Sequence, residues 1–249
     1  MEFIFITLFP ELIEQACGHS IIKRAVDAGL LSVYCVNPRD FTTDKHRTVD
    51  DTPCGGGVGM VLKPEPFSAA IAVAKKRSPQ GLIVALTPGG KTLCQKQVEK
   101  LAGQGQDLIF LCGHYEGFDE RILEQADIKI SIGDYVLTGG ELPALVIMDA
   151  IARFIPGVLG KAASAEEESF SSSLLEYPQY TRPIDFEGAK VPDVLLSGNH
   201  AAIKRWRRKE GIRATYCFRP DLLAKANLEE GDGSLLLEII EELKGKQNE

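Results

Sequence analysis

Long apolar runs are missing from the sequence, and this absence excludes a membrane-spanning helix. Such a helix needs roughly 18 or more consecutive apolar residues, and no apolar stretch of the 249-residue chain approaches that length. The apolar N-terminus carries an acid at Glu2 and lacks the basic residues that open a signal peptide, so we expect a buried first strand there. The sequence therefore predicts a soluble protein with no membrane partner.

Cysteines are few and irregularly spaced. No two of the six cysteines are separated by the two residues that are typical of zinc sites. We expect reduced thiols, most of them small core residues, and a cytoplasmic location. No metal ligand can be named from the sequence.

The sequence also has no overall excess of basic residues. Its net charge of −7 disfavours a protein surface that attracts nucleic-acid phosphates everywhere. The charge is unevenly distributed, however, because residues 199–219 hold seven basic residues and one acid. An acidic protein with one concentrated basic segment can still bind RNA through that segment.

The glycine motifs of common nucleotide-binding proteins are absent. No GxGxxG opens a helix after the first strand, so a dinucleotide site is not indicated. The string TPGGKT suggests a phosphate-binding loop, but the Walker pattern requires a glycine where this chain has Ala85. Pro88 also removes one amide donor from the loop. A nucleotide hydrolase is therefore disfavoured.

Segments of strand and helix character alternate over the first two thirds of the chain, a pattern that predicts an α/β fold with a parallel sheet. We expect strands over residues 2–8, 31–36, 82–86, 107–112 and 128–132. We expect helices over residues 10–28, 65–76, 94–102 and 120–125, and loops over 87–91 and 113–117. Residues 37–63 form a long tract without predicted structure, which is typical of a functional segment.

The stretch from Ser131 to Gly160 is the one around which the chain is organised. It contains glycines at Gly133 and at Gly139–Gly140, and then an apolar helix that begins at Glu141 with Pro143 in its first turn. Glycines allow the backbone to approach a ligand closely. The pattern is equally that of a strand, a tight turn and a buried helix, so pattern alone leaves a ligand cradle open.

The composition divides the chain into two domains and a linker. We expect a large domain over residues 1–160, a small acidic and serine-rich linker over 161–173, and a small helical domain over 174–249. Its helices are expected near residues 199–211, 220–226 and 234–244, the first capped by Ser197 or Asn199. The linker composition also fits a tether with no other role.

Several long strings resemble the bacterial tRNA (guanine-N1)-methyltransferases, the TrmD family of the SPOUT superfamily. The strings, which cover nearly the whole chain, are VDDTPCGGGVGM (49–60), GHYEGFDER (113–121), IGDYVLTGGELPA (132–144), RFIPGVLG (153–160), LLEYPQYTRP (174–183) and LLSGNHAAIKRWRR (195–208). The resemblance implies a deep trefoil knot in the parallel sheet, which no local pattern indicates. It also implies a homodimer with the active site at the subunit interface.

The resemblance further implies a reaction. Members of the family transfer a methyl group from S-adenosylmethionine to N1 of guanosine 37, next to the anticodon of tRNA, and depend on Mg²⁺. The residues expected to bind the cofactor come from three loops; they are Leu86, Thr87, Pro88, Gly113, Tyr115, Ile132, Gly133, Tyr135, Leu137, Gly139 and Gly140.

Three residues are candidates for catalysis by the same resemblance. Glu168 takes the place of the family's aspartate base, and its extra methylene is a departure that can shift the geometry by about 1 Å and cost on the order of 100-fold in rate. Glu167 is the alternative base. In a third interpretation neither residue is catalytic, and both belong to a solvated acidic linker. Arg153 matches the cation that stabilises negative charge on the guanine. The alternative is an ordinary arginine at the end of a helix, where it interacts with the helix dipole. Glu116 assists near the methyl group.

Substrate contacts are expected in two places. Asp50, Gly55 and Gly59 match the region that contacts the target guanosine, against the alternative of a flexible surface loop. In the basic segment we expect phosphate contacts from Lys204, Arg205, Arg207 and Arg208. Trp206 fits a core position better than a base-stacking one. His114 stands where many members have arginine and receives no catalytic role.

Two other classes of function stay open. The first is a non-catalytic protein that binds tRNA and the cofactor, which the departure at Glu168 keeps in view. The second is a nucleotide hydrolase built on Gly89–Thr92, which would bind ATP or GTP instead of S-adenosylmethionine.

Overall fold

The computed structural model describes residues 1–159, 169–170 and 173–246 of the chain. The chain divides into two compact units, Met1–Ala162 and Ala163–Glu249. Each unit is described by itself. Within the described residues, no helix combines the length and apolar character that crossing a membrane would require.

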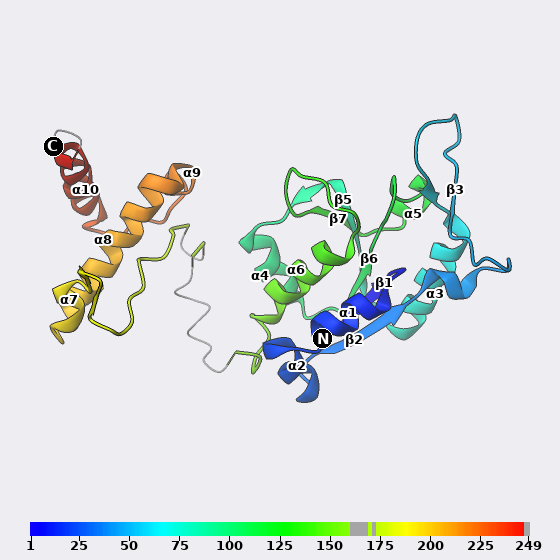
Figure 1. Ribbon diagram of the computed structural model, residues 1–249, viewed down its shortest axis with the longest axis horizontal. Helices are drawn as coiled ribbons and strands as arrows, with labels where there is room; N and C mark the ends of the chain where they lie inside the picture. The colour runs from blue at the N-terminus through cyan, green and yellow to red at the C-terminus, as the bar shows by residue number, and fades with distance from the viewer. Residues whose placement is uncertain (160–168, 171–172, 247–249) are drawn as a thin grey trace. The chain divides into compact units, whose positions relative to one another are not determined.

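The N-terminal unit is built on a five-stranded sheet in the order β2-β1-β6-β5-β7, in which all neighbouring strands are parallel. This arrangement confirms the predicted α/β fold with a parallel sheet. The strands are β1 (Glu2–Ile6), β2 (Ser32–Val36), β5 (Leu82–Thr92), β6 (Leu108–Leu111) and β7 (Ile128–Ser131). The central strands are continuous apolar runs because helices cover the sheet on both faces (Figure 1).

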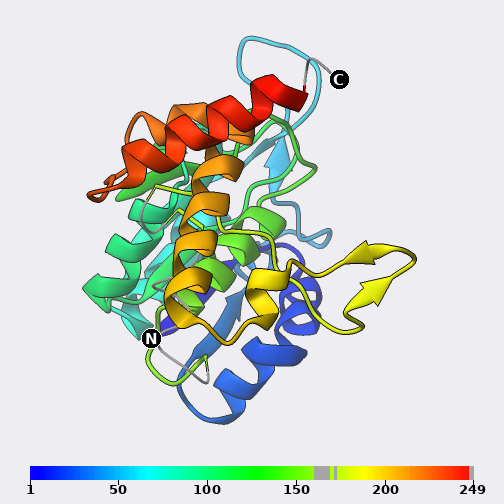
Figure 2. The same ribbon diagram turned by 90° about the vertical axis from the view of Figure 1, so that its left-hand side faces the viewer.

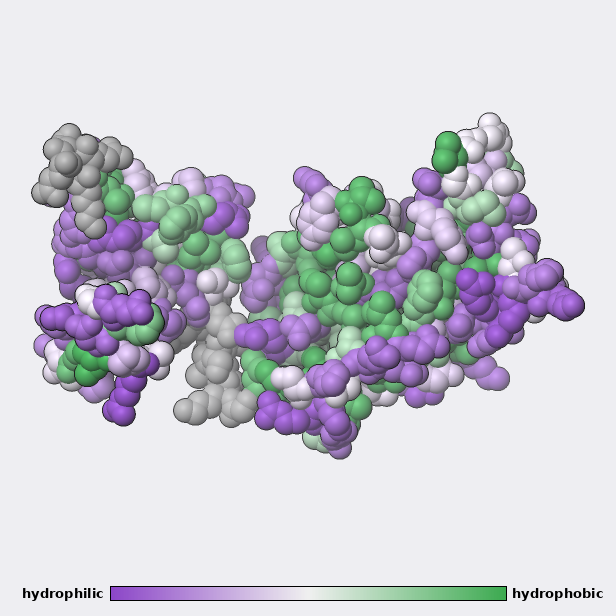
Figure 3. Space-filling model, viewed as in Figure 1, coloured by the Kyte–Doolittle hydropathy of each residue, from purple (hydrophilic) through white to green (hydrophobic). Residues whose placement is uncertain are grey.

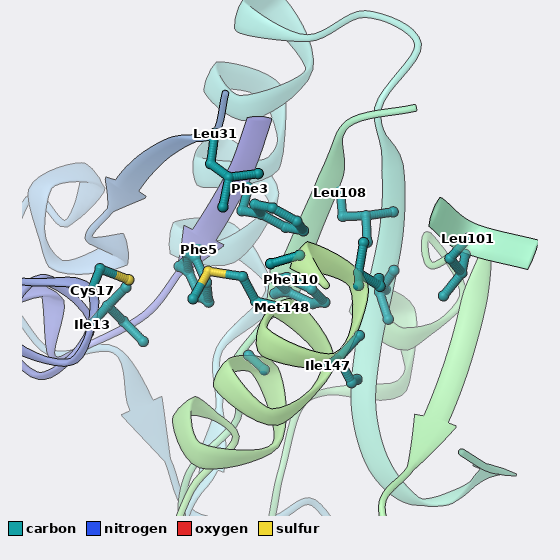
Figure 4. Close-up of a cluster of buried hydrophobic side chains, with 14 of the residues drawn as sticks. Phe3, Phe5, Ile13, Cys17, Leu31, Leu101, Leu108, Phe110, Ile147 and Met148 are labelled. Atoms are coloured by element: carbon teal, nitrogen blue, oxygen red, sulfur yellow. The ribbon is translucent and has the colours of Figure 1, made fainter. Parts of the chain in front are cut away.

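The two faces of the sheet carry separate cores. Successive side chains of a strand point to opposite faces, so Phe3 and Phe5 enter one core and Ile4 and Ile6 the other. Figure 4 shows the first core, where Phe110 and Met148 meet. This core is covered by α1 (Pro10–Cys17), α2 (Ser20–Asp27), α4 (Gln95–Gln104) and α6 (Glu141–Ala152). The second core is covered by α3 (Pro64–Arg77) and α5 (Glu120–Leu123).

The helical segment expected over residues 10–28 is present as two helices, because Gly18 ends α1 and the helical path resumes as α2. One predicted boundary in this unit is wrong. The loop expected over residues 87–91 is the continuation of β5, where Lys91 pairs with Ile130 after a register shift. A bulge lets a strand resume pairing beyond an irregular stretch, and the glycines and proline of this stretch hid the strand from the sequence pattern.

The tract of residues 37–63 is not structureless as predicted. Asn37 caps the 3-10 helix η1 (Pro38–Phe41) by accepting a hydrogen bond from the Arg39 amide. The short strands β3 (Asp50–Asp51) and β4 (Val61–Leu62) pair antiparallel and leave a glycine-rich loop between them. The tract therefore presents a hairpin whose tip is the glycine run.

The C-terminal unit consists of a hairpin and four helices within the described residues. The elements are β8 (Asp185–Phe186), β9 (Ala189–Lys190), α7 (Asp193–Leu196), α8 (His200–Phe218), α9 (Pro220–Leu223) and α10 (Asp232–Lys246). Helix α10 lies across α8 (Figure 2) around a small core that contains Ile212 and Ile239. Asn199 caps α8 as predicted, but the helix runs past Gly211 to Phe218.

Candidate functional site

A pocket of about 440 Å³ opens in the N-terminal unit beyond the ends of β6 and β7 and beside the irregular part of β5. Ligands of parallel α/β sheets bind outside the carboxyl ends of the strands, so the position is the expected one. The walls come from residues 86–88 of β5 and from the loops around residues 113–118 and 132–140. Segments far apart in the sequence thus share one cavity.

The structure brings all of the predicted cofactor-binding residues together in this pocket. Those that line it are Leu86, Thr87, Pro88, Gly113, Tyr115, Ile132, Gly133, Tyr135, Leu137, Gly139 and Gly140. Their role as cofactor ligands stays a prediction. The lining combines apolar side chains and five glycines with polar side chains such as His114, Glu116 and Glu120, and the glycines suit a ligand approached closely by main-chain groups.

Gly140 shows why glycine is needed in the pocket wall. Its amide donates a hydrogen bond of 2.8 Å to the carbonyl of Gly113, and this bond joins two of the loops. A Cβ at Gly140 would lie 2.7 Å from the Cα of Cys112, closer than carbon atoms approach. The close packing of two backbones therefore fixes the loop that carries Gly113 and Tyr115.

The glycine-rich hairpin tip is joined to the same wall. The Glu116 amide donates a 3.0 Å hydrogen bond to the carbonyl of Met60, and the Leu62 amide donates to the carbonyl of Gly117. Gly59 has a φ of +90°, and any side chain at this position would collide with the Glu116 carboxylate. The structure thus places the predicted substrate residue Gly59 against the predicted catalytic residue Glu116. Asp50 sits in β3 at the base of this hairpin.

A buried polar network beneath the pocket was not predicted. The Glu141 carboxylate is 3% exposed, accepts a 2.6 Å hydrogen bond from the Thr7 hydroxyl and lies 2.7 Å from Nε2 of His114. His114 is a pocket-lining residue, so Glu141 ties the first turn of α6 to the pocket wall. Burial, together with the charge of Glu141, raises the pKa of the nearby Cys112 thiol well above its usual range.

Of the remaining predicted catalytic residues, the structure describes only Arg153, which does not line the pocket of its own chain. Arg153 ends α6, twelve residues after Glu141, and at 1.5 Å per residue it lies about 18 Å along the helix from the pocket-lining turn. Glu168 and its alternative Glu167 lie outside the described residues, so the structure neither supports nor opposes their role. Gly55 is exposed at the hairpin tip.

The predicted phosphate-binding residues of α8 fall into two groups. Arg205 forms an ion pair of 2.5 Å with Glu238, and Arg208 forms one of 2.6 Å with Asp232. Lys204 is exposed, and Arg207 lies over the ring of Tyr177 at 4.9 Å. Trp206 is half-buried and lies outside the core cluster of this unit.

Comparison with known proteins decides the family. The model of the tRNA (guanine-1)-methyltransferase TrmD family matches residues 1–225. The chain belongs to this family. A tRNA (guanine-N(1)-)-methyltransferase of Desulfitobacterium hafniense is 54% identical over 242 residues, which cover 97% of this chain and 92% of the relative. Relatives of the same name from Dictyoglomus turgidum and a Synechococcus strain are 54% and 52% identical, each with 96% of its own length covered.

Family membership leaves the metal question open. Among the side chains that the structure describes, no group of three or more His, Cys, Asp or Glu residues is arranged to hold a metal ion. The described residues therefore offer no ligand set for the Mg²⁺ that the family resemblance implies.

Sequence reasoning did not find the network of Glu141, Thr7 and His114 at this candidate site. The signal for Glu141 was an acid in the first turn of a helix, which favours the positive end of the helix dipole. Its burial depends on Thr7 and His114, which come from distant segments. Such a three-way contact has no local sequence pattern.

Proposed function

We propose that the chain, as a tRNA (guanine-N1)-methyltransferase, transfers the methyl group of S-adenosylmethionine to N1 of guanosine 37 of tRNA. The observation that carries the proposal is the pocket. All of the residues predicted to bind the cofactor line it together, in a chain that belongs to this family. A flat adenosine portion fits between apolar residues, and backbone amides and carbonyls supply its polar partners.

The chemistry requires a base and a stabilising charge. S-adenosylmethionine, when bound, supplies an electrophilic methyl group on a sulfonium. N1 of neutral guanine carries a proton, so a general base has to remove it as the methyl group arrives. We assign this role to Glu168. Negative charge then develops on O6 of the guanine, and a guanidinium beside it stabilises the transition state more than the ground state. We assign this role to Arg153.

Glu116 completes the proposed set from the pocket wall. Its amide is fixed by Met60 and its carboxylate lies under Gly59. A carboxylate at this position can attract the sulfonium or accept a hydrogen bond from the guanine edge. The hairpin tip with Gly55 and Gly59, and Asp50 at its base, would then contact the target nucleotide.

A homodimer with a composite site is part of the proposal. Arg153 lies at the opposite end of α6 from the pocket of its own chain. The outer side of α6 carries two exposed apolar residues, Leu142 (54%) and Val146 (48%), followed by the exposed Asp149, and Phe9 and Leu12 are exposed nearby on and before α1. Figure 3 shows the hydrophobic surface over these two helices. Antiparallel packing of two α6 helices about a two-fold axis would bring Arg153 of each chain towards the pocket of the other.

Three further parts of the proposal rest on the family resemblance. These are the deep trefoil knot of the SPOUT fold, the use of Mg²⁺, for which we assign no ligands, and a cytoplasmic site of action. The division into a cofactor domain over residues 1–160, a linker over 161–173 and a tRNA-binding domain over 174–249 is likewise proposed.

Methyl transfer to two tRNA transcripts that differ only at position 37 tests the function. The protein is incubated with radiolabelled S-adenosylmethionine and one tRNA that carries guanosine or adenosine at position 37. We expect label only in the guanosine transcript, and its loss in Glu168→Gln but not in the matched variant Glu167→Gln. Cofactor binding without label in either transcript would favour a non-catalytic binding protein. Thermal stabilisation by ATP or GTP, but not by S-adenosylmethionine, would favour a nucleotide hydrolase.

A further inference from the structure

The cations of α8 are divided into those with acidic partners among the described residues and those without. For the first group, ion pairs with acids of α10 or of the turn before it neutralise the basic side chains. These cations are Arg205, Arg208, Lys209 and Arg213. Lys204 and Arg207 are exposed, and no carboxylate of the described residues forms an ion pair with either. The net positive charge that this segment offers to a partner is therefore concentrated at these two residues.

An aromatic cluster adjoins Arg207, and Lys204 lies three residues before Arg207 on α8. The ring centroid of Trp206 is 6.3 Å from those of Tyr177 and Tyr180, and the Arg207 guanidinium lies over the face of Tyr177. Tyr180 is 49% exposed. Contacts with Trp206 thus attach the two tyrosines to α8 and leave about half of the Tyr180 side chain accessible.

We infer that Lys204, Arg207, Tyr180 and Trp206 form a binding platform for one unpaired nucleotide of the tRNA. The base stacks on the partly exposed rings of Tyr180 and Trp206, and the adjoining phosphates are bound by Lys204 and Arg207. This inference rests on the proposed function for the identity of the RNA, and it uses residues of the C-terminal unit alone.

The chemistry favours an unpaired base over a duplex. Aromatic side chains contribute to RNA binding by stacking on bases whose faces are open, whereas bases in a helix already stack on their neighbours. Each such stack contributes substantially to affinity and tolerates any base. Cations beside the rings, and not acids, complete the match to a nucleotide.

The single tryptophan of the chain gives a direct readout. Trp206 is the only tryptophan, so its fluorescence reports on the platform without labelling. We expect saturable quenching by an unmodified tRNA transcript. A fully paired RNA duplex with the same number of phosphates should bind more weakly and leave the fluorescence nearly unchanged. Unchanged fluorescence at tRNA concentrations that saturate a filter-binding assay would overturn the inference.

Substitutions separate stacking from charge. Tyr180→Leu should weaken tRNA binding about 10-fold without changing its salt dependence. Lys204→Gln and Arg207→Gln should each lower the slope of log affinity against log salt by about one. The matched controls are Tyr216→Leu, a partly exposed tyrosine of the same helix, and Lys209→Gln, which removes a charge already paired with Glu238 and Glu242. Both controls should keep the affinity and the slope of the wild type.

Methyl transfer measured over a range of tRNA concentrations distinguishes the two proposals. Tyr180→Leu should raise the KM for tRNA about 10-fold, whereas the control Tyr216→Leu, outside the platform, should keep both the kcat and the KM of the wild type. Equal affinity of Tyr180→Leu and wild type, with both folded by thermal melting, would reduce the cluster to packing. Absence of methyl transfer in the wild type would instead overturn the proposed function. The quenching of Trp206 fluorescence by tRNA would still test whether the platform binds RNA.

Discussion

Glu141 is a charged residue in an apolar helix, and its contacts explain its position. Its two carboxylate oxygens meet the Thr7 hydroxyl and the His114 ring, each from a different segment. We predict that Glu141→Ala lowers the free energy of unfolding by roughly 2 kcal/mol, because it leaves a buried hydroxyl without an acceptor. Glu141→Gln, which keeps an acceptor for Thr7, should cost less. Urea unfolding measures both, and equal stability of the alanine variant and the wild type would contradict the prediction.

Two hairpin-tip glycines with similar φ angles provide a matched pair. Gly56 and Gly59 have φ values of +84° and +90°, but a side chain at Gly56 meets nothing within 4 Å, whereas one at Gly59 collides with Glu116. We predict that Gly59→Ala lowers kcat/KM for methyl transfer on the order of 100-fold by displacing Glu116. Gly56→Ala carries a similar φ strain and should stay near wild type. Equal losses in both variants would assign the effect to strain alone.

At the scale of elements, ion pairs join α8 to α10 and to the turn before it. Burial raises the pKa of Asp232, but hydrogen bonds from Arg208 and from the Glu229 amide outweigh it, so the net pKa is below the ordinary value. Hydrogen bonds from Lys209 lower the pKa of Glu238 and of Glu242. Carboxylates with depressed pKa values stabilise the fold above their unfolded pKa of about 4, and this stability is lost as the pH falls through the folded values.

We therefore predict that the C-terminal unit loses stability below about pH 4. Asp232→Asn should remove roughly 2 kcal/mol at pH 7, because it breaks a charged hydrogen-bonded pair, and should flatten the acid dependence. Denaturant titrations at pH 7 and pH 3, followed by the fluorescence of Trp206 in this unit, measure both effects. An acid dependence as steep in Asp232→Asn as in the wild type would show that other carboxylates carry it.

The elements that could be predicted are those with a local signal. The strands around Phe5 and Phe110 are short apolar runs, and the cap of α8 is an asparagine before a helical pattern, so sequence alone located them. The extension of β5 through Lys91 depends on pairing with Ile130 of β7 and has no signal of its own. For the same reason the pairing of β3 with β4 stayed hidden inside a glycine-rich tract.

At the scale of the whole molecule, the site is assembled from parts that are distant in sequence. The family resemblance named the three segments, and three parallel strands bring them together, β6 and β7 at their ends and β5 at its irregular part. The sequence did not indicate the separation between the pocket and Arg153. The length of α6 separates them, but this is evident only once the first turn of α6 is known to line the pocket. That separation makes the composite site testable.

Mixing two inactive variants is a direct test of the composite site. If Arg153 acts in the pocket of the partner chain, a dimer of one Arg153→Ala chain and one Glu116→Ala chain contains one site with both residues intact. After the variants are unfolded and refolded together in equal amounts, half of the dimers are mixed and half of their sites are intact, so we predict about a quarter of the wild-type methyl transfer. Each variant refolded alone should stay near its own low activity.

The control for this experiment lies on the apolar side of α6. Leu142→Glu introduced into both variants places a charge on the exposed apolar surface that we assign to the dimer, and a charge buried without a partner disfavours association. We expect these chains to elute as monomers and to show no recovery on mixing. Val73→Glu, at an exposed valine of α3 on the other face of the sheet, should leave both the dimer and the recovery intact. If the variants without Leu142→Glu formed mixed dimers and recovered no activity, the composite site would be contradicted, and Arg153 would have to act within its own chain.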